Sequence, residues 1–342
     1  MQTATWLSDM LRNQVNRLAR KWCAPIAVWV LIAPGSLAQA AFSGSKGLPR
    51  VGILSGYGNL SPVKNLEKEL ERLGWINGAT AIIDVRHSTG PIDQLPKLAA
   101  DLVHAKCDAI TAFTGSAAVA IQGTKTAIPT VVYGAHDGVA IGLFQSLARP
   151  GGTFTGTESL GPLLDEKRAE LLRVLVPGVR NLAVIHNPLN PNAGPHLSSN
   201  QLITKRMGIN LVPVPVSSQA DFPAALDALE NPALDAALIY TDEVTFLMPG
   251  FPYPRKRKLP TVCEFEFQAS LQGCLISYGP RLAEFARTSA KQADEILKGA
   301  DPATMPVQVM TRFELVLNRS VAKALGIVVP HELLVRADKV VD

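Results

Sequence analysis

Short apolar runs alternate with segments of helical periodicity along most of this 342-residue chain, and this alternation limits the fold more than any other feature. In the first half, strand-like runs lie at residues 50–54, 81–85, 109–113 and 130–133. Helix-like segments separate them at residues 63–73, 95–103 and 117–122, with apolar residues spaced for one helix face. Strands separated by helices of this length are typical of βαβ units, which form parallel sheets covered on both faces.

The alternation stops at Pro150-Gly151-Gly152 and then starts again. Strand-like runs follow at residues 182–186, 211–216, 236–240, 261–263 and 275–277, with helical patterns at 164–175, 197–207 and 224–229. A long helix over residues 282–297 and an apolar segment at 313–317 close the chain. We therefore predict an α/β fold in which two doubly wound parallel-sheet lobes, each of about 110 to 150 residues, are joined by a hinge.

The first forty residues have the pattern of an export signal. A basic stretch that ends at Arg20-Lys21 precedes an apolar segment at residues 24–33 and the small-residue sequence Ala38-Gln39-Ala40. This order is typical of a secretory signal peptide, so we expect residues 1–40 to be removed and the periplasmic chain to begin at Ala41. A membrane anchor is the alternative, but the apolar run is about half of the roughly 20 residues that a span needs.

Composition and charge exclude two classes of protein. With 47% hydrophobic and 18% charged residues, the chain is unlike an intrinsically disordered one. The chain has 33 basic and 29 acidic residues, and residues 1–40 hold four of the basic and one of the acidic ones, which leaves a net charge of +1 on the remainder. A nearly neutral body argues against a nucleic-acid partner, which requires a clustered basic face.

Three cysteines lie beyond the signal segment, and an odd number cannot form a closed set of disulfides. Cys263 and Cys274 could pair with each other, but both lie in apolar, strand-like runs. Buried thiols behave as small apolar side chains. We therefore expect Cys107, Cys263 and Cys274 to be buried free thiols.

Polar and aromatic residues follow the predicted strands of both halves. In doubly wound sheets, ligands bind at the carboxyl ends of the strands, where helix N-termini present free N–H groups. Six clusters fall at these positions, and two facing sheets would enclose them in one cleft. The candidate ligand-binding residues are Ser55, Gly56, Tyr57, Thr114, Gly115, Ser116, Tyr133, His136, Asp137, Asn187, Tyr240, Asp242, Glu264 and Phe265.

Each candidate also has an ordinary structural interpretation. The hydroxyls of Thr114 and Ser116, with the helix that they open, suit a carboxylate or another anion, but they are equally expected as helix N-caps. Asp242 suits an ammonium or hydroxyl group, with capping again as the alternative. Aromatic residues at strand ends can sandwich a flat ligand, although single ones more often pack in the core.

Eight stretches together resemble the ABC transporter substrate-binding proteins of the tryptophan/tyrosine-type family, which have the type I periplasmic-binding-protein fold. Each stretch is short, but their order and spacing are specific, and they run from residue 50 nearly to the end of the chain. The stretches are RVGILS (50–55), LPKLAADLV (95–103), SLARPGGT (146–153), KRAELL (167–172), VIHNP (184–188), SYGP (277–280), FELVLN (313–318) and AKALG (322–326).

The resemblance implies two lobes that close on a small ligand and then dock on a membrane permease driven by an ATPase. We expect an N-terminal lobe of residues 41–157 and about 278–303, and a C-terminal lobe of residues 158–277 and about 304–342. Family members commonly carry Gly-Asp-Pro in the loop after the fourth strand, whereas this chain has His136-Asp137-Gly138. The ligand of the best-known members, an aromatic amino acid, therefore cannot be carried over to this chain.

Ligand capture for an ABC importer is the leading functional hypothesis, with a small amino-acid-like or carboxylate-bearing ligand and a monomeric protein. An extracytoplasmic sensing module for a membrane receptor or kinase is the alternative, because it shares the fold. A secreted hydrolase is disfavoured, since Thr114-Gly115-Ser116-Ala117-Ala118 lacks the second Gly of a nucleophile elbow. The six histidines show no zinc-site spacing, and we expect no catalytic residue, metal or cofactor.

Overall fold

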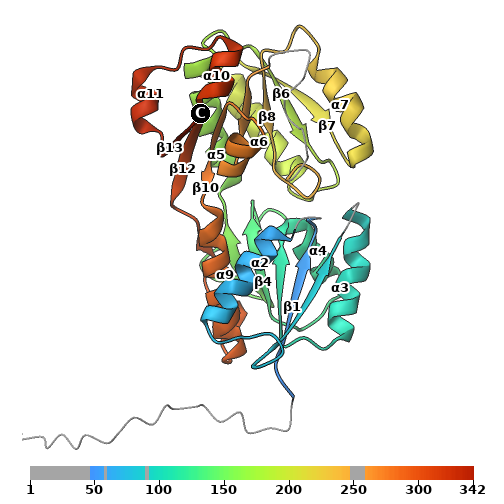
Figure 1. The fold of residues 1–342 in the computed structure, drawn as a ribbon. Helices are drawn as coiled ribbons and strands as arrows, with labels where there is room; N and C mark the ends of the chain where they lie inside the picture. The colour runs from blue at the N-terminus through green and yellow to red at the C-terminus, as the bar shows by residue number, and fades with distance from the viewer. Residues whose placement is uncertain (1–46, 58–59, 89–91, 247–258) are drawn as a thin grey trace, which may run out of the picture. The chain divides into compact units, whose positions relative to one another are not determined.

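The computed structural model describes residues 47–57, 60–88, 92–246 and 259–342 (Figure 1). Residues 46–342 form one compact unit that holds two β-sheets with their helices. The expected signal peptide and the basic run at residues 255–258 lie outside the described residues. Within the described residues, no helix is both long enough and apolar enough to cross a membrane.

The first sheet has six parallel strands in the order β11-β5-β4-β3-β1-β2. Their bounds are Arg50–Ser55 (β1), Ile82–His87 (β2), Ala109–Phe113 (β3), Thr130–Ala135 (β4), Phe154–Glu158 (β5) and Gln308–Val309 (β11). Its helices are Ser61–Arg72 (α2), Leu95–His104 (α3), Thr114–Gly123 (α4) and Leu282–Leu297 (α9).

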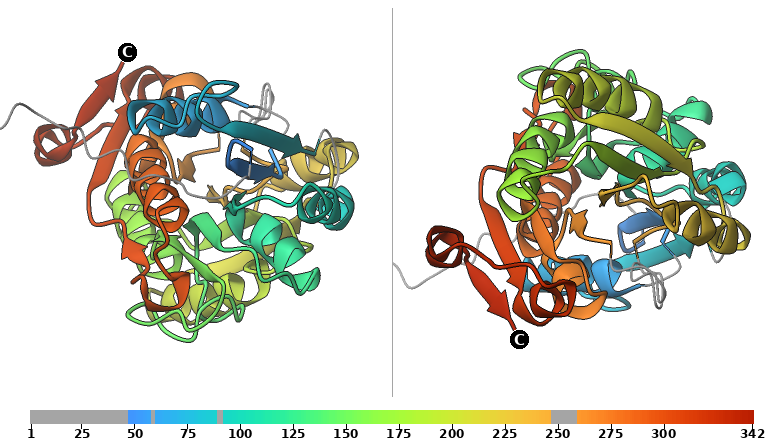
Figure 2. Two further views of the ribbon diagram at one scale, coloured as in Figure 1. Left: turned by 90° about the horizontal axis from the view of Figure 1, so that it is seen from below. Right: turned by 90° about the horizontal axis from the view of Figure 1, so that it is seen from above.

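Two hydrophobic clusters, one on each face of this sheet, show why it is doubly wound. On one face, Leu66 of α2 and Phe285 of α9 pack with Val51 of β1, and the two helices lie side by side (Figures 1 and 2). On the other face, Leu102 of α3 and Ile121 of α4 pack in a separate cluster. Because both faces are covered, the central strands β3 and β4 are apolar along most of their length, which is the pattern seen in the sequence.

The second sheet has seven strands in the order β13-β12-β10-β9-β8-β6-β7. Its strands are Asn181–His186 (β6), Asn210–Pro215 (β7), Ala236–Ile239 (β8), Thr261–Cys263 (β9), Ile276–Pro280 (β10), Phe313–Asn318 (β12) and Lys339–Val341 (β13). Its helices are Gly161–Leu175 (α5), Ala193–Arg206 (α6), Phe222–Leu229 (α7), Glu266–Leu271 (α8), Arg319–Leu325 (α10) and His331–Arg336 (α11). All strand pairs are parallel except β10 with β12.

The predicted two-sheet α/β fold is confirmed, and several details differ from the prediction. Strand β5 was not predicted, because Phe154–Glu158 alternates apolar and small polar residues and follows Pro150-Gly151-Gly152. The antiparallel strand β12 gives the second sheet a mixed edge, where α10, α11 and β13 gather at the C-terminus (Figure 1). The lobe boundaries stay a prediction; strand pairing adds that Gln308–Val309, expected in the C-terminal lobe, belong with β5 of the first sheet, and that residues 278–280, expected in the N-terminal lobe, belong to β10 of the second.

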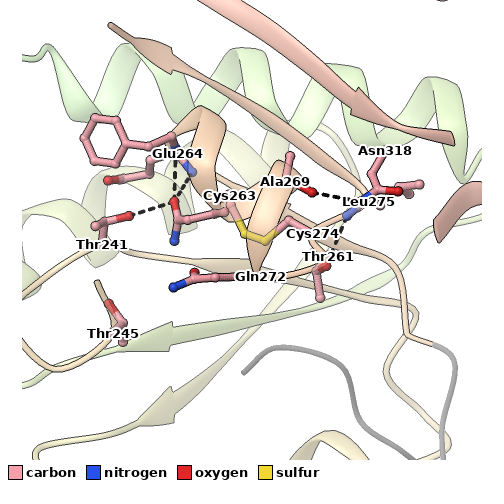
Figure 3. The surroundings of a disulfide bond; sticks show 12 residues. Thr241, Thr245, Thr261, Cys263, Glu264, Ala269, Gln272, Cys274, Leu275 and Asn318 are labelled. Atoms are coloured by element: carbon pink, nitrogen blue, oxygen red, sulfur yellow. Dashed lines mark hydrogen bonds between the residues drawn. A yellow bond between two sulfur atoms is a disulfide. The ribbon is translucent and has the colours of Figure 1, made fainter. Parts of the chain in front are cut away.

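The expectation of three free thiols is wrong. Cys263, the last residue of β9, forms a disulfide with Cys274, which precedes β10 (Figure 3). Helix α8 connects these adjacent strands, and the chain after it brings Cys274 beside Cys263, with 6.3 Å between the two Cα atoms. Cys107 is the buried free thiol, and burial raises its pKa to about 11.

Candidate ligand-binding site

The carboxyl ends of strands from both sheets meet around a small cavity of about 20 Å³. The first sheet contributes His136, and the second sheet and helix α6 contribute the rest of the lining: Asn187, Asn190, Asn192, Ala193, His196, Tyr240, Thr241, Asp242 and Glu264. A space of this size holds about one water molecule. The polar edges of the two sheets are therefore in near-direct contact.

Helix α4 opens toward this edge without a side-chain cap. Its N-cap residue is Phe113, and Thr114 follows with φ of +78°. A β-branched residue in this region of backbone space is a strained outlier, and such outliers cluster at binding sites. The Thr114 hydroxyl donates a hydrogen bond to the Glu243 carboxylate instead of capping its own helix. The N-cap alternative therefore does not describe Thr114.

The turn at residues 242–246 contacts the first sheet in two further places. Gly56 follows β1, and a Cβ at this position would lie 2.3 Å from Cγ of Glu243, so only glycine admits the carboxylate side chain. The Tyr57 ring stacks on Phe246 with 4.3 Å between ring centroids. Gly115 is likewise covered by Asn192, whose amide nitrogen would lie 2.5 Å from an added Cβ.

Asp242 has a structural use for one oxygen and none for the other. Oδ1 accepts hydrogen bonds from the backbone N–H groups of Val244 and Thr245, at 2.8 and 2.9 Å, which fixes the turn. Oδ2 is buried and has no hydrogen-bond donor. Burial, together with the neighbouring Glu243, raises the pKa of Asp242 to about 7. Oδ1 therefore has the capping role, and Oδ2 is available to accept a hydrogen bond from an ammonium or hydroxyl group of a ligand.

A buried ionic network lies behind the cavity on the second-sheet side. Asp165 and Arg168 stand one turn apart on α5, and Arg168 is only 2% exposed. Arg168 donates to Asp165 and, through Nε, to the backbone carbonyl of Tyr278 at 2.8 Å. Its Nη1 lies 3.5 Å from Oε1 of Glu264. His196 pairs with the second oxygen of Asp165 and stacks on Tyr240 at 4.0 Å.

The charges of this network balance, and those of the turn do not. Burial opposes ionisation of both Asp165 and His196, but their mutual attraction, with Arg168 adding to it at the carboxyl, lowers the pKa of Asp165 and raises that of His196. Arg168 and His196 thus face Asp165 and Glu264. Burial raises the pKa of Glu243 as well, and within the described residues Asp242 and Glu243 have no ion-pair partner.

Several buried polar atoms around the cavity have no hydrogen-bond partner. They include Nδ2 of Asn187, both side-chain amide atoms of Asn192, both carboxyl oxygens of Glu264 and Oδ2 of Asp242, with Ser116 Oγ and Glu243 Oε2 beside them. Native proteins leave few such groups, and those that occur usually serve water, an ion or a ligand. A ligand with several donors and acceptors is what this edge can hold.

The structure separates the sequence candidates into two groups. His136, Asn187, Tyr240, Asp242 and Glu264 line the cavity, while Ser55, Gly56, Tyr57, Thr114, Gly115 and Ser116 lie on the adjoining first-sheet edge. Tyr133, Phe265 and Asp137 have other contacts: Tyr133 and Phe265 pack in the first hydrophobic cluster, and Asp137 accepts from the N–H of Ala140 in a loop.

The sequence analysis missed Asp165, Arg168, Asn192, His196 and Glu243. Asp165 and Arg168 gave a signal, because they fall in the helical stretch that also places Leu164 and Leu172 in the core, where charges are rare unless they are paired. Glu243 falls with Asp242 in a strand-end cluster, but nothing in the sequence pointed to its contact with Thr114 of the other sheet.

A larger cavity of about 710 Å³ lies along helices α3 and α4. Its lining is mostly apolar and includes Leu95, Val103 and Val119 of the first lobe and Leu189 of the second, and Ser116 lines it as well. It lacks the concentration of buried, unpartnered polar atoms found at the strand ends, so the smaller cavity is the candidate site. Within the described residues, no group of His, Cys, Asp and Glu is placed to hold a metal ion.

The site and fold define a two-lobed α/β binding protein. Residues 51–341 match the model of the family described as ABC transporter substrate binding protein, and the chain belongs to this family. The resemblance found in the sequence is thereby confirmed. A curated relative is a Tyrosine-binding protein of Clostridioides difficile (strain R20291), 27% identical over 267 residues, which span 77% of this chain and 75% of that protein.

Solved structures show the same fold. An ABC domain from Streptococcus pneumonia in complex with L-Trp has a TM-score of 0.78 and 22% identity, over 86% of this chain and all of that one. A conserved domain protein from Vibrio cholerae has a TM-score of 0.76 at the same identity and coverage. A ligand-free, open substrate binding protein with adhesive properties from Clostridium difficile has a TM-score of 0.60 and 20% identity, over 86% of this chain and 99% of that one.

Proposed function

We propose that this protein is the extracytoplasmic binding component of an ABC importer. It captures a small amino-acid-like or carboxylate-bearing ligand between the two sheets and delivers it to a membrane permease driven by an ATPase. It acts as a monomer, without catalysis and without a cofactor. Family membership supports the class, and the signal-like first forty residues support export.

One observation carries the proposal: the strand ends of both sheets converge on a cavity lined by buried polar groups that lack partners. A ligand held there contacts both lobes at once, so binding is coupled to lobe closure. Asp242 offers a free carboxyl oxygen to an ammonium or hydroxyl group, and the α4 N-terminus with Ser116 offers donors to an anion. These two places match the two ends of an amino-acid-like ligand.

A thermal-shift screen of the mature protein against amino acids, aromatic acids, purines and short-chain carboxylates tests ligand capture. A ligand at 100 times its dissociation constant adds about 2.7 kcal/mol of stability. Ser116→Ala and Asp242→Asn are each expected to weaken binding by about 1 to 3 kcal/mol, because a charged ligand group loses its partner in a closed cleft. Asp137→Asn is the matched control, since Asp137 also lies in a loop that follows a strand but does not line the cavity.

Uptake distinguishes transport from capture alone. Cells that carry the permease genes are expected to accumulate the radiolabelled ligand only when this protein is present. If the wild-type protein binds no compound of the screen, or if Asp137→Asn weakens binding as much as Asp242→Asn does, the assignment of the site is wrong. If binding is found but uptake is independent of the protein, the importer role is wrong.

A further inference from the structure

We propose that the turn at residues 242–246 is a built-in competitor of the ligand. Its Glu243 carboxylate and Phe246 ring lie on the first-sheet groups that a ligand would otherwise contact. The inference rests on the proposed function, because it takes the ligand to bind at this edge. It assigns to Glu243 and Phe246 a role opposite to that of ligand contacts.

The carboxylate of Glu243 lies at the place expected for a ligand anion. It accepts a hydrogen bond from the Thr114 hydroxyl at the first residue of α4. The hydroxyl of Ser116, a residue only 6% exposed, also favours the ionised form of Glu243 and lowers its pKa against the larger effect of burial. The Thr114 hydroxyl and a helix N-terminus thus serve a carboxylate that belongs to the protein itself.

The aromatic contact is independent of the carboxylate contact. Phe246, 4% exposed, stacks on Tyr57 at 4.3 Å, and its other neighbour is Phe267 at 4.8 Å. The ring therefore covers the Tyr57 face that a flat ligand group would use. A carboxylate and an aromatic ring, three residues apart, occupy an anion site and an adjacent ring site on the first sheet.

The turn that carries both groups is held rigidly. Asp242 accepts from the N–H groups of Val244 and Thr245, the Thr245 hydroxyl donates to the carbonyl of Tyr240 at 2.6 Å, and the Phe246 N–H donates to the carbonyl of Asp242 at 2.8 Å. Because the turn is fixed to the second sheet, Glu243 and Phe246 reach the first sheet only when the lobes are closed, and they leave together when the lobes separate.

The cavity at the strand ends is too small for a ligand in this arrangement. The cavity of about 20 Å³ compares with roughly 300 to 1,000 Å³ for small-molecule sites. The ligand therefore enters only after the Glu243 and Phe246 contacts break, and the free energy of those contacts is subtracted from that of binding. The measured affinity equals the intrinsic affinity multiplied by the fraction of molecules that are open.

Variants of the turn distinguish a competitor of the ligand from a ligand contact. Removing a competitor raises the affinity for the ligand, whereas removing a ligand contact lowers it. Glu243→Gln and Phe246→Ala are each expected to tighten binding of the ligand found in the screen, by about 5- to 30-fold, because the competing contact is lost. Asp242→Asn, one residue away, is the matched control and is expected to weaken binding. Weaker or unchanged binding in both Glu243→Gln and Phe246→Ala would overturn the proposal while leaving ligand capture intact.

A second readout needs no ligand. Spin labels at Lys97→Cys on α3 and Lys205→Cys on α6 report the distance between the lobes, since both positions are exposed and Cys107 is buried. The otherwise unchanged protein is expected to show a short distance without ligand, and the Glu243→Gln/Phe246→Ala double variant a longer one. An unchanged distance in the double variant would overturn the proposal, whether or not the screen finds a ligand. A screen that finds no ligand contradicts the proposed function and not this proposal.

Discussion

The two edges that form the site differ in how they carry charge. The first-sheet edge offers the hydroxyls of Thr114 and Ser116, a helix N-terminus, and His136, whose pKa is lowered chiefly by burial. The second-sheet edge gathers four carboxyl groups, Arg168 and His196 in a small volume. One edge therefore uses neutral dipoles and the other uses ions.

Because of this difference, the stability of the second lobe depends more on buried charges than that of the first. Ions buried in a protein interior are costly unless each has a partner, so the second lobe depends on the completeness of its network. The first lobe has no comparable cluster among its described ion pairs, which are partly exposed, as Arg50 with Asp84 is. The second lobe is accordingly expected to be the more sensitive of the two to substitution and to redox conditions.

Removing the central cation of the network has the largest expected effect. Arg168→Met leaves Asp165 and Glu264 without their guanidinium partner, and the loss of one member of a buried ion pair costs about 3 to 5 kcal/mol. Arg50→Met in the first lobe is the matched control, with an expected cost of about 1 kcal/mol or less, because its ion pair is partly exposed. Urea unfolding of both variants measures the difference; equal losses would remove the contrast between the lobes.

The second-largest effect is expected from the disulfide of the second lobe. Cys263 and Cys274 close a short loop, with a sequence separation of 11, that contains α8 and Glu264. Opening a loop of this length is expected to cost about 3 kcal/mol. A reductant should lower the unfolding midpoint of the wild-type protein and of Cys107→Ala, and it should have no effect on Cys263→Ala/Cys274→Ala. A reductant effect that persists in the double variant would contradict the assignment.

A smaller effect is expected from a buried carboxyl of the first sheet. Glu158 accepts from the N–H groups of Gly138 and Ser159, and burial nevertheless raises its pKa to about 7. Since the folded-state pKa lies above the unfolded one, the stabilisation is complete at low pH and is lost as pH rises through about 7. From pH 5 to pH 8 this group should remove roughly 2 kcal/mol of stability. Urea unfolding should show a flatter pH dependence in Glu158→Gln; an unchanged slope would refute this account of Glu158.

The sequence predicted the parts of the molecule that repeat a local pattern. The apolar run at residues 109–113 and the helix of Leu282–Leu297 could be located because burial on both sheet faces, or on one helix face, leaves a periodic record. Thr114 and Ser116 could be placed at a strand end by the same reasoning. Their partner Glu243 could not, since its contact joins residues 129 positions apart and depends on how the lobes close.

The disulfide and the ionic network were missed for a related reason. Cys263 and Cys274 have the apolar surroundings of buried thiols, and only the reversal of the chain through α8 brings them together. Asp165 could have been noticed with Arg168 on α5, but its pairing with His196 of α6 joins two helices whose packing no local pattern specifies.

Hydrogen exchange with and without ligand is the most direct test of whether the strand ends of both sheets hold a ligand. With the ligand found by the thermal-shift screen, the account predicts slower amide exchange at residues 114–118 of the first lobe and at residues 187–192 of the second. Protection that is confined to one lobe, or to α3 beside the larger apolar cavity, would contradict it.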